Sequence, residues 1–113
     1  MRALIAGLLL CLVAACASLG RAERTYTGVY AEGTEVMTFQ ADGETQTWSV
    51  TGPAVAALQN AAPPRPNPWD GFQIRAIVRG HLSAPGRYGH LGMFRREITI
   101  TEVVLAPAPE RTP

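Results

Sequence analysis

The stretch TEVMTFQADGETQTWSV, residues 34–50, contains two short runs of alternating side chains separated by one turn. Alternation with a period of two is typical of a strand with one buried face. Asp42-Gly43 between the runs favours a tight hairpin, because glycine accepts a positive φ without steric cost. The stretch therefore predicts strands over residues 34–40 and 45–50. The larger apolar side chains expected on one face of each strand are Met37, Phe39, Trp48 and Val50.

The residues on either side extend this pattern. Residues 26–31 form the expected first strand, with Glu32-Gly33 as its turn, which completes a three-stranded meander. Pro53 suits the first turn of a helix, and residues 54–62 have helix-forming composition with Val55 and Leu58 on one stripe. Four prolines between residues 63 and 68 end this helix after about two turns.

Two further strands are expected over residues 72–82 and 96–105, and Gly80 predicts a bulge or bend in the first of them. The order is β-β-β-α-β-β, so the fold class is all-β with a small α contribution. This order predicts an OB-like five-stranded barrel over residues 26–105. A flat α+β roll is the alternative. Trp48 is expected in the core, whereas Trp69 is either packed over a barrel end or exposed.

The composition sets the size of the protein and excludes one class of function. A chain of 113 residues holds one domain at most. Its apolar fraction of 47% and charged fraction of 17% indicate that most of it folds. The net charge is +1, and all ten basic residues are arginine. A nucleic-acid binder usually carries a strongly basic face, so nucleic acid is not an expected partner.

The N-terminal residues have the pattern of an export signal. Arg2 precedes thirteen residues without a polar side chain, which is shorter than the roughly 18–20 that span a bilayer. Residues 1–15 are therefore predicted to be a lipoprotein signal peptide. Leu12-Val13-Ala14-Ala15 before Cys16 resembles the bacterial lipobox, which implies a diacylated Cys16 at the mature N-terminus. The alternative is an ordinary signal peptide cut after residue 15 or 17, with Cys16 incidental.

Lipidation would place the protein on a membrane. Residues 16–25 are then a lipidated tether, and acyl chains such as palmitate anchor the protein stably when there are two or more of them. Ala17 after the cysteine favours the periplasmic face of the outer membrane, with the inner membrane or a soluble periplasmic form as alternatives. Cys11 leaves with the signal, so the exported domain holds no disulfide. Residues 106–113 are expected to form a disordered, Pro-rich tail.

Short segments of the mature chain resemble a group of small proteobacterial lipoproteins with an OB-like domain, similar to the C-terminal domain of the copper-homeostasis and envelope-stress lipoprotein NlpE. The segments are Gly28-Val29-Tyr30, the hairpin from residue 39 to 48, Val78-Arg79-Gly80, Tyr88-Gly89-His90-Leu91-Gly92 and Ile98-Thr99-Ile100. The resemblance implies the fold and an envelope location. The cysteine expected after Phe39 and the Cys-x-x-Cys motif of NlpE are both missing, so copper or redox sensing is not implied.

The loop before the last strand is the candidate ligand or partner site, because in OB-folds this loop flanks the binding face. Its candidate residues are Arg87, Tyr88, His90, Met93 and Phe94. The alternative is that Tyr88 and Phe94 cap the open end of the barrel. His81 and His90 are weak metal candidates, with Glu97 or Asp70 as a third ligand, since two histidines alone do not form a recognised ligand spacing.

Catalysis is not expected. The mature serines are Ser18, Ser49 and Ser83, and none has the context of an activated nucleophile. No cofactor is expected either. The sequence thus favours a non-catalytic, membrane-anchored lipoprotein of the bacterial envelope, a protein-interaction or envelope-maintenance and stress module with an envelope protein as its partner. The alternative function is a small-ligand or metal-binding module that uses the loop between the fourth and fifth strands.

Overall fold

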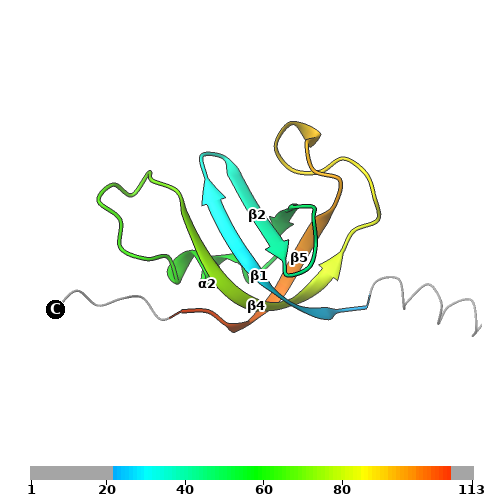
Figure 1. The fold of residues 1–113 in the computed structure, drawn as a ribbon, viewed down its shortest axis with the longest axis horizontal. Helices are drawn as coiled ribbons and strands as arrows, with labels where there is room; N and C mark the ends of the chain where they lie inside the picture. The colour runs from blue at the N-terminus through cyan, green and yellow to red at the C-terminus, as the bar shows by residue number, and fades with distance from the viewer. Residues whose placement is uncertain (1–21, 108–113) are drawn as a thin grey trace, which may run out of the picture.

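A computed structural model describes residues 22–107 of the chain. The predicted signal peptide, Cys16, most of the tether and most of the tail lie outside the described residues. The structure is mostly β with one short helix (Figure 1). Its elements are β1 (Arg24–Gly33), β2 (Val36–Ala41), β3 (Trp48–Thr51), α2 (Val55–Asn60), β4 (Phe72–Leu82), a 3₁₀ turn η1 (His90–Gly92) and β5 (Glu97–Leu105).

The five strands close into a barrel in the order β1-β2-β3-β5-β4, and β4 pairs with β1 to complete the circle. The β3–β5 pairing is parallel and the other four are antiparallel. The helix α2 lies between β3 and β4 in the chain. This mixed, closed topology is that of an OB-like barrel. The fold class predicted from the sequence is confirmed, and the α+β roll is excluded.

The first hairpin is longer than the sequence indicates. Strand β1 extends through Gly33, which pairs with Val36 at the start of β2. The turn therefore consists of Thr34 and Glu35, and the expected turn at residues 32–33 is wrong. Glu35 takes the positive φ of this turn, at 60°, although it is not a glycine. Strand β3 is shorter than expected, because residues 42–47 form the loop between β2 and β3.

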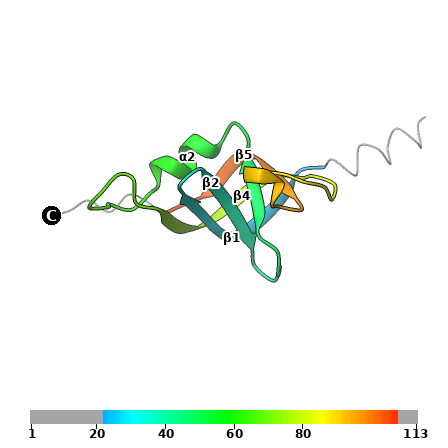
Figure 2. The ribbon, with the colours of Figure 1, turned by 90° about the horizontal axis from the view of Figure 1, so that it is seen from above.

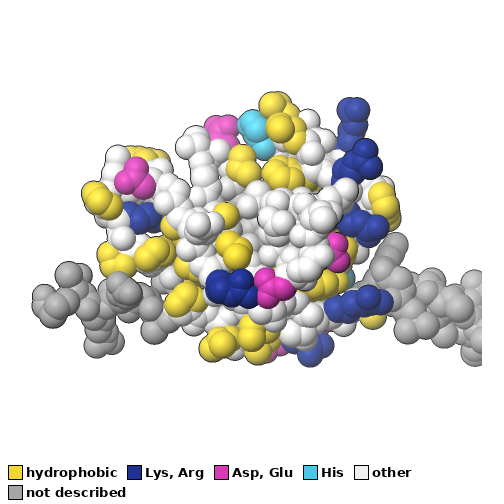
Figure 3. Space-filling model, viewed as in Figure 1, with side chains coloured by type: hydrophobic (Ala, Val, Ile, Leu, Met, Phe, Trp, Pro, Cys, Tyr) yellow, Lys and Arg dark blue, Asp and Glu magenta, His cyan; other side chains and the backbone are white. Residues whose placement is uncertain are grey.

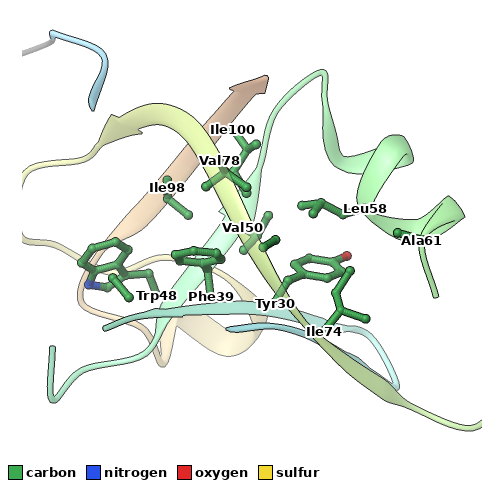
Figure 4. Close-up of a cluster of buried hydrophobic side chains, with 12 residues drawn as sticks. Tyr30, Phe39, Trp48, Val50, Leu58, Ala61, Ile74, Val78, Ile98 and Ile100 are labelled. Atoms are coloured by element: carbon green, nitrogen blue, oxygen red, sulfur yellow. The ribbon is translucent and has the colours of Figure 1, made fainter. Parts of the chain in front are cut away.

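Aromatic rings line the inside of the barrel (Figure 4). Trp48 is 4% exposed, so its predicted core position is confirmed. Its ring meets Tyr26 edge-on at 5.3 Å between centroids and stacks on Phe39 at 6.4 Å. Contacts of this geometry stabilise a core beyond simple area burial. The buried side chains around them include Tyr30, Val50, Leu58, Ile74, Val78, Ile98 and Ile100.

The helix α2 closes one end of the barrel (Figure 2). Leu58 is fully buried and points into the core, and Val55 packs against the same cluster, as the predicted stripe requires. The backbone N–H of Ala54 donates to the carbonyl oxygen of Ile100 at 3.2 Å, which fixes the start of the helix against β5.

Gly80 bends β4 as the sequence predicts. The β4–β5 register shifts between Arg79 and Gly80, and a Cβ on Gly80 would overlap the carbonyl oxygen of Thr99. Only glycine lets the two backbones approach this closely. The start of β1 lies beside this bend, because Arg24 pairs with Gly80.

Candidate functional site

The β4–β5 loop, residues 83–96, is an arm with its own hydrogen-bond ladder. The N–H of Gly86 donates to the carbonyl of Arg95 at 2.9 Å, and Tyr88 and Phe94 exchange two backbone hydrogen bonds of 2.9 and 3.1 Å. The Tyr88 hydroxyl donates to the carbonyl of Ala84 at 2.8 Å. These bonds satisfy the backbone of a long loop internally, so the arm has one defined shape.

The arm is also fixed to the barrel at Gly89. This glycine has a φ of 70°, and a Cβ there would lie 2.6 Å from Ser49 Oγ and 2.8 Å from Phe94 Cδ2. Ser49 is a buried polar residue of β3, and its hydroxyl donates to Glu97 Oε2 at 3.2 Å. The N–H of Glu97 in turn donates to Ser83 Oγ at 2.8 Å. The arm therefore rests on β3 and on the first residue of β5.

The tip of the arm meets the β1–β2 turn. His90 Nδ1 lies 3.9 Å from Glu35 Oε2. Next to His90, Leu91 has a φ of 57° and is 82% exposed. Met93 is 73% exposed. Figure 3 shows histidine, acidic and hydrophobic side chains close together at one edge of the molecule. We call the surface made by Glu35, His90, Leu91 and Met93 the tip surface.

Backbone strain is concentrated at the tip surface. Within residues 22–107, Glu35 and Leu91 are the two non-glycine residues with a positive φ. They belong to separate loops that the fold brings together through the Glu35–His90 contact. Non-glycine residues held in this region cost of order 1–3 kcal/mol each, and such strain clusters at functional sites.

The candidate residues that the sequence indicated in this loop differ in how exposed they are. Arg87, His90 and Met93 are exposed, whereas Tyr88 and Phe94 are half-buried and bridge the arm. Tyr88 and Phe94 thus serve the arm's own shape. Sequence reasoning missed Glu35, whose role depends on a tertiary contact. It also missed Leu91. The sequence did indicate that this side chain is exposed, because a large apolar residue between two loop glycines is poorly placed to join a core.

The two histidines lie in different surroundings. Across the described chain, no three His, Asp or Glu side chains come together as metal ligands would. His90 faces Glu35. His81 lies on β4 opposite Thr99, and its Nδ1 is buried without a hydrogen-bond partner among these residues.

Two of the three serines considered as nucleophiles are described, and both have structural bonds. Ser49 is buried against Glu97, and Ser83 accepts the N–H of Glu97. The pKa of the Tyr30 hydroxyl is raised above its ordinary value. Burial raises its pKa, and a 2.7 Å hydrogen bond to Glu32 Oε2 raises it further. Tyr30 is fully buried in the core, so its neutral hydroxyl belongs to the packing of the barrel.

Some arginine side chains of the described residues lie next to a carboxylate, and others do not. Arg75 bonds Asp42 at 2.6 Å, and Arg79 lies 3.7 Å from Glu23. Arg24, Arg87 and Arg95 have no carboxylate within 4.0 Å among residues 22–107. Arg87 and Arg95 line one hollow on the arm, of about 480 Å³, together with Pro85, Gly86, Gly92, Met93 and Phe94.

Comparison with protein-family models, curated proteins and solved structures finds no match to this chain. The OB-like fold is therefore established by its own topology, and the likeness to the NlpE domain stays a prediction beyond that fold. None of the helices within residues 22–107 is long and apolar enough to cross a membrane.

Proposed function

We propose that this protein is a lipid-anchored module of the bacterial envelope that contacts a protein partner through its tip surface. The observation that carries the proposal is the meeting of two strained loops around exposed Leu91 and Met93. A chain gains no stability from holding a leucine at positive φ in water, whereas a contact surface benefits from a rigid apolar projection. Methionine suits such surfaces because its side chain adapts to different partners.

The sequence before the barrel supports the anchor. The lipobox-like residues end at Cys16, and β1 begins eight residues later at Arg24. Eight residues span at most about 26–29 Å when fully extended. A lipid on Cys16 would hold the barrel next to its membrane, and Ala17 favours the periplasmic face of the outer membrane as that location.

A non-catalytic role fits the side chains at the tip surface. A nucleophile needs a base within hydrogen-bond reach, and the described serines are instead bonded to Glu97 in structural positions. The resemblance to the NlpE domain supports envelope maintenance or stress signalling as the process served. The proposed partner is therefore an envelope protein.

The anchor and the contact are tested separately in living cells. Cys16→Ser removes the acylated sulfur, so the variant should leave the membrane fraction while wild type stays in it. Leu91→Asn with Met93→Gln removes the apolar projection, and asparagine tolerates the positive φ. This double variant should stay in the membrane fraction but recover at least about tenfold less partner after cross-linking in intact envelopes. Each of the two exposed anchors contributes about 1 kcal/mol or more, and a tenfold change corresponds to about 1.4 kcal/mol.

Trp69→Ser is the matched control, because Trp69 is 86% exposed in a loop elsewhere on the barrel. It should recover as much partner as wild type. Equal recovery by wild type and the Leu91/Met93 variant would overturn the tip surface as the contact. Equal partitioning of wild type and Cys16→Ser would overturn the anchor.

A further inference from the structure

We propose that the arginines of the β4–β5 arm face the membrane and bind anionic phospholipid headgroups, which orients the barrel. The inference rests on the proposed lipid anchor and adds a second, electrostatic contact to it. Its residues are Arg87 and Arg95 on the arm and Arg24 at the start of β1.

The fold places these arginines on the side of the barrel where the anchored segment would enter. Arg24 pairs with Gly80 near the end of β4, and the arm leaves β4 two residues later. Figure 3 shows dark blue side chains gathered along the side where β1 begins and β4 ends. The start of β1 is also eight residues from Cys16, within about 26–29 Å of a lipid attached there.

Arg87 and Arg95 are arranged to bind an anion from outside the chain. The Tyr88–Phe94 bridge places residues 87 and 95 opposite each other in the arm, and both line the same hollow of about 480 Å³. Both positive charges would attract an anion in this hollow, and no carboxylate of the described residues lies within 4.0 Å of either guanidinium group. Arginine matches phosphate oxygens with paired donors.

The charge distribution favours a membrane over a soluble anionic ligand. The chain as a whole is close to neutral, so attraction depends on where its charges lie. Arg75 and Arg79, which lie on β4, are already paired with acids. An anionic surface attracts nearby arginines by about 1 kcal/mol each, and only within about a Debye length of roughly 8–10 Å. A short lipid tether would keep the arm within that range.

The test measures the orientation of the mature chain, purified from membranes and reconstituted in vesicles. A fluorophore on Ala84→Cys reports the arm, and one on Asn67→Cys reports the α2–β4 loop on the opposite side of the barrel. The vesicles carry a quencher on the headgroups and are made of phosphatidylcholine with or without phosphatidylglycerol. Quenching at residue 84 should exceed that at residue 67, and phosphatidylglycerol should increase it.

Arg87→Gln with Arg95→Gln should reduce the population docked on phosphatidylglycerol about 30-fold, as expected for two surface arginines. Arg65→Gln with Arg75→Gln is the matched control, since it removes the same charge elsewhere and should leave quenching unchanged. Near-ultraviolet circular dichroism checks that both variants are folded.

The outcomes separate this inference from the anchor. Loss of binding to phosphatidylcholine vesicles by wild type would overturn the anchor. The arginine contact alone would be overturned if the protein is anchored normally but the quenching at residue 84 does not change with phosphatidylglycerol or with the Arg87/Arg95 substitutions. A third outcome is that the chain binds inorganic phosphate saturably in the absence of vesicles, and that vesicles do not strengthen this binding. This outcome would assign the hollow to a soluble anion and would also overturn the arginine contact with the membrane.

Discussion

The β4–β5 arm and the α2–β4 loop, residues 61–71, are both long excursions from one barrel, yet they are held in different ways. The arm carries a ladder of backbone hydrogen bonds and rests on β3 through Gly89. The α2–β4 loop has only local hydrogen bonds. The N–H groups of Ala61 and Ala62 donate to the last turn of α2, and those of Trp69 and Asp70 donate to Asn67. Its two ends also contact the barrel, since Ala61 is buried in the core and the backbone of Gly71 closely approaches the carbonyl oxygen of Glu32. Between them, Arg65 lies over the ring of Phe72 at 4.7 Å.

The difference shows how one protein can keep exposed apolar side chains in two physical settings. Leu91 and Trp69 have nearly the same exposed fraction, at 82% and 86%. Leu91 sits on a braced arm at a strained φ, whereas Trp69 sits on a loop shaped by prolines and one asparagine turn. A rigid projection loses less entropy on binding, which is why the proposed partner contact belongs to the arm.

Replacing Gly89 by alanine is expected to break the arm most strongly. The added Cβ would meet Ser49 Oγ and Phe94 at a φ of 70°, so the free energy of unfolding should fall by about 2–4 kcal/mol. Gly43→Ala is the control, because Gly43 has a φ of 83° but open space around it. It should lose only about 1–2 kcal/mol. Urea denaturation measures both, and equal losses would contradict the close contact of arm and barrel.

The free energy of unfolding should fall at high pH because of Tyr30, which packs at the base of the α2–β4 loop. Phe72, which follows the loop, packs on the Tyr30 ring at 5.9 Å. Burial raises the pKa of Tyr30, so above about pH 10 the unfolded chain releases a proton that the folded barrel keeps. Stability is then complete below pH 10 and falls as pH rises further, by up to about 1.4 kcal/mol per pH unit.

Urea denaturation between pH 8 and 12, on wild type and Tyr30→Phe, checks this sign. Phenylalanine has no proton to release, so the variant should have a flatter profile. A profile as steep as that of wild type would show that another group causes the loss.

Removing the Tyr88 hydroxyl tests a single brace of the arm. Tyr88→Phe loses the 2.8 Å bond to the carbonyl of Ala84, which should lower the free energy of unfolding by about 1 kcal/mol. Hydrogen exchange should speed up at Gly86 and Phe94, whose N–H groups belong to the ladder. Unchanged exchange at both amides would mean that the backbone ladder holds the arm without the hydroxyl.

Substituting Trp69 should have the smallest effect. Trp69→Ser removes a side chain that is 86% exposed, so the free energy of unfolding should change by less than about 0.5 kcal/mol. Thermal denaturation is sufficient to measure it. A loss above about 1 kcal/mol would show that Trp69 packs on the barrel and that the contrast with the arm is weaker than described.

Most of the fold could be predicted from the sequence because its signals are local. Alternation around Asp42-Gly43 and the prolines after the helix act through neighbouring residues. Gly80 also left a local signal, because it interrupts the apolar face of its strand, although the close approach of Thr99 that requires it is a tertiary contact. The positions that were wrong depend on pairing. Gly33 joined β1 because it pairs with Val36, which moved the turn onto Glu35. The tip surface could be predicted only in part, since the Glu35–His90 contact joins segments far apart in the chain.

The partner contact of the tip surface is tested most directly by photo-cross-linking in intact cells. A photoreactive amino acid at position 91 is compared with the same amino acid at position 69, in the otherwise unchanged chain. The account predicts one specific cross-linked envelope protein from position 91 and none from position 69. A cross-link to that protein from position 69 alone, or no specific product from position 91, would contradict it.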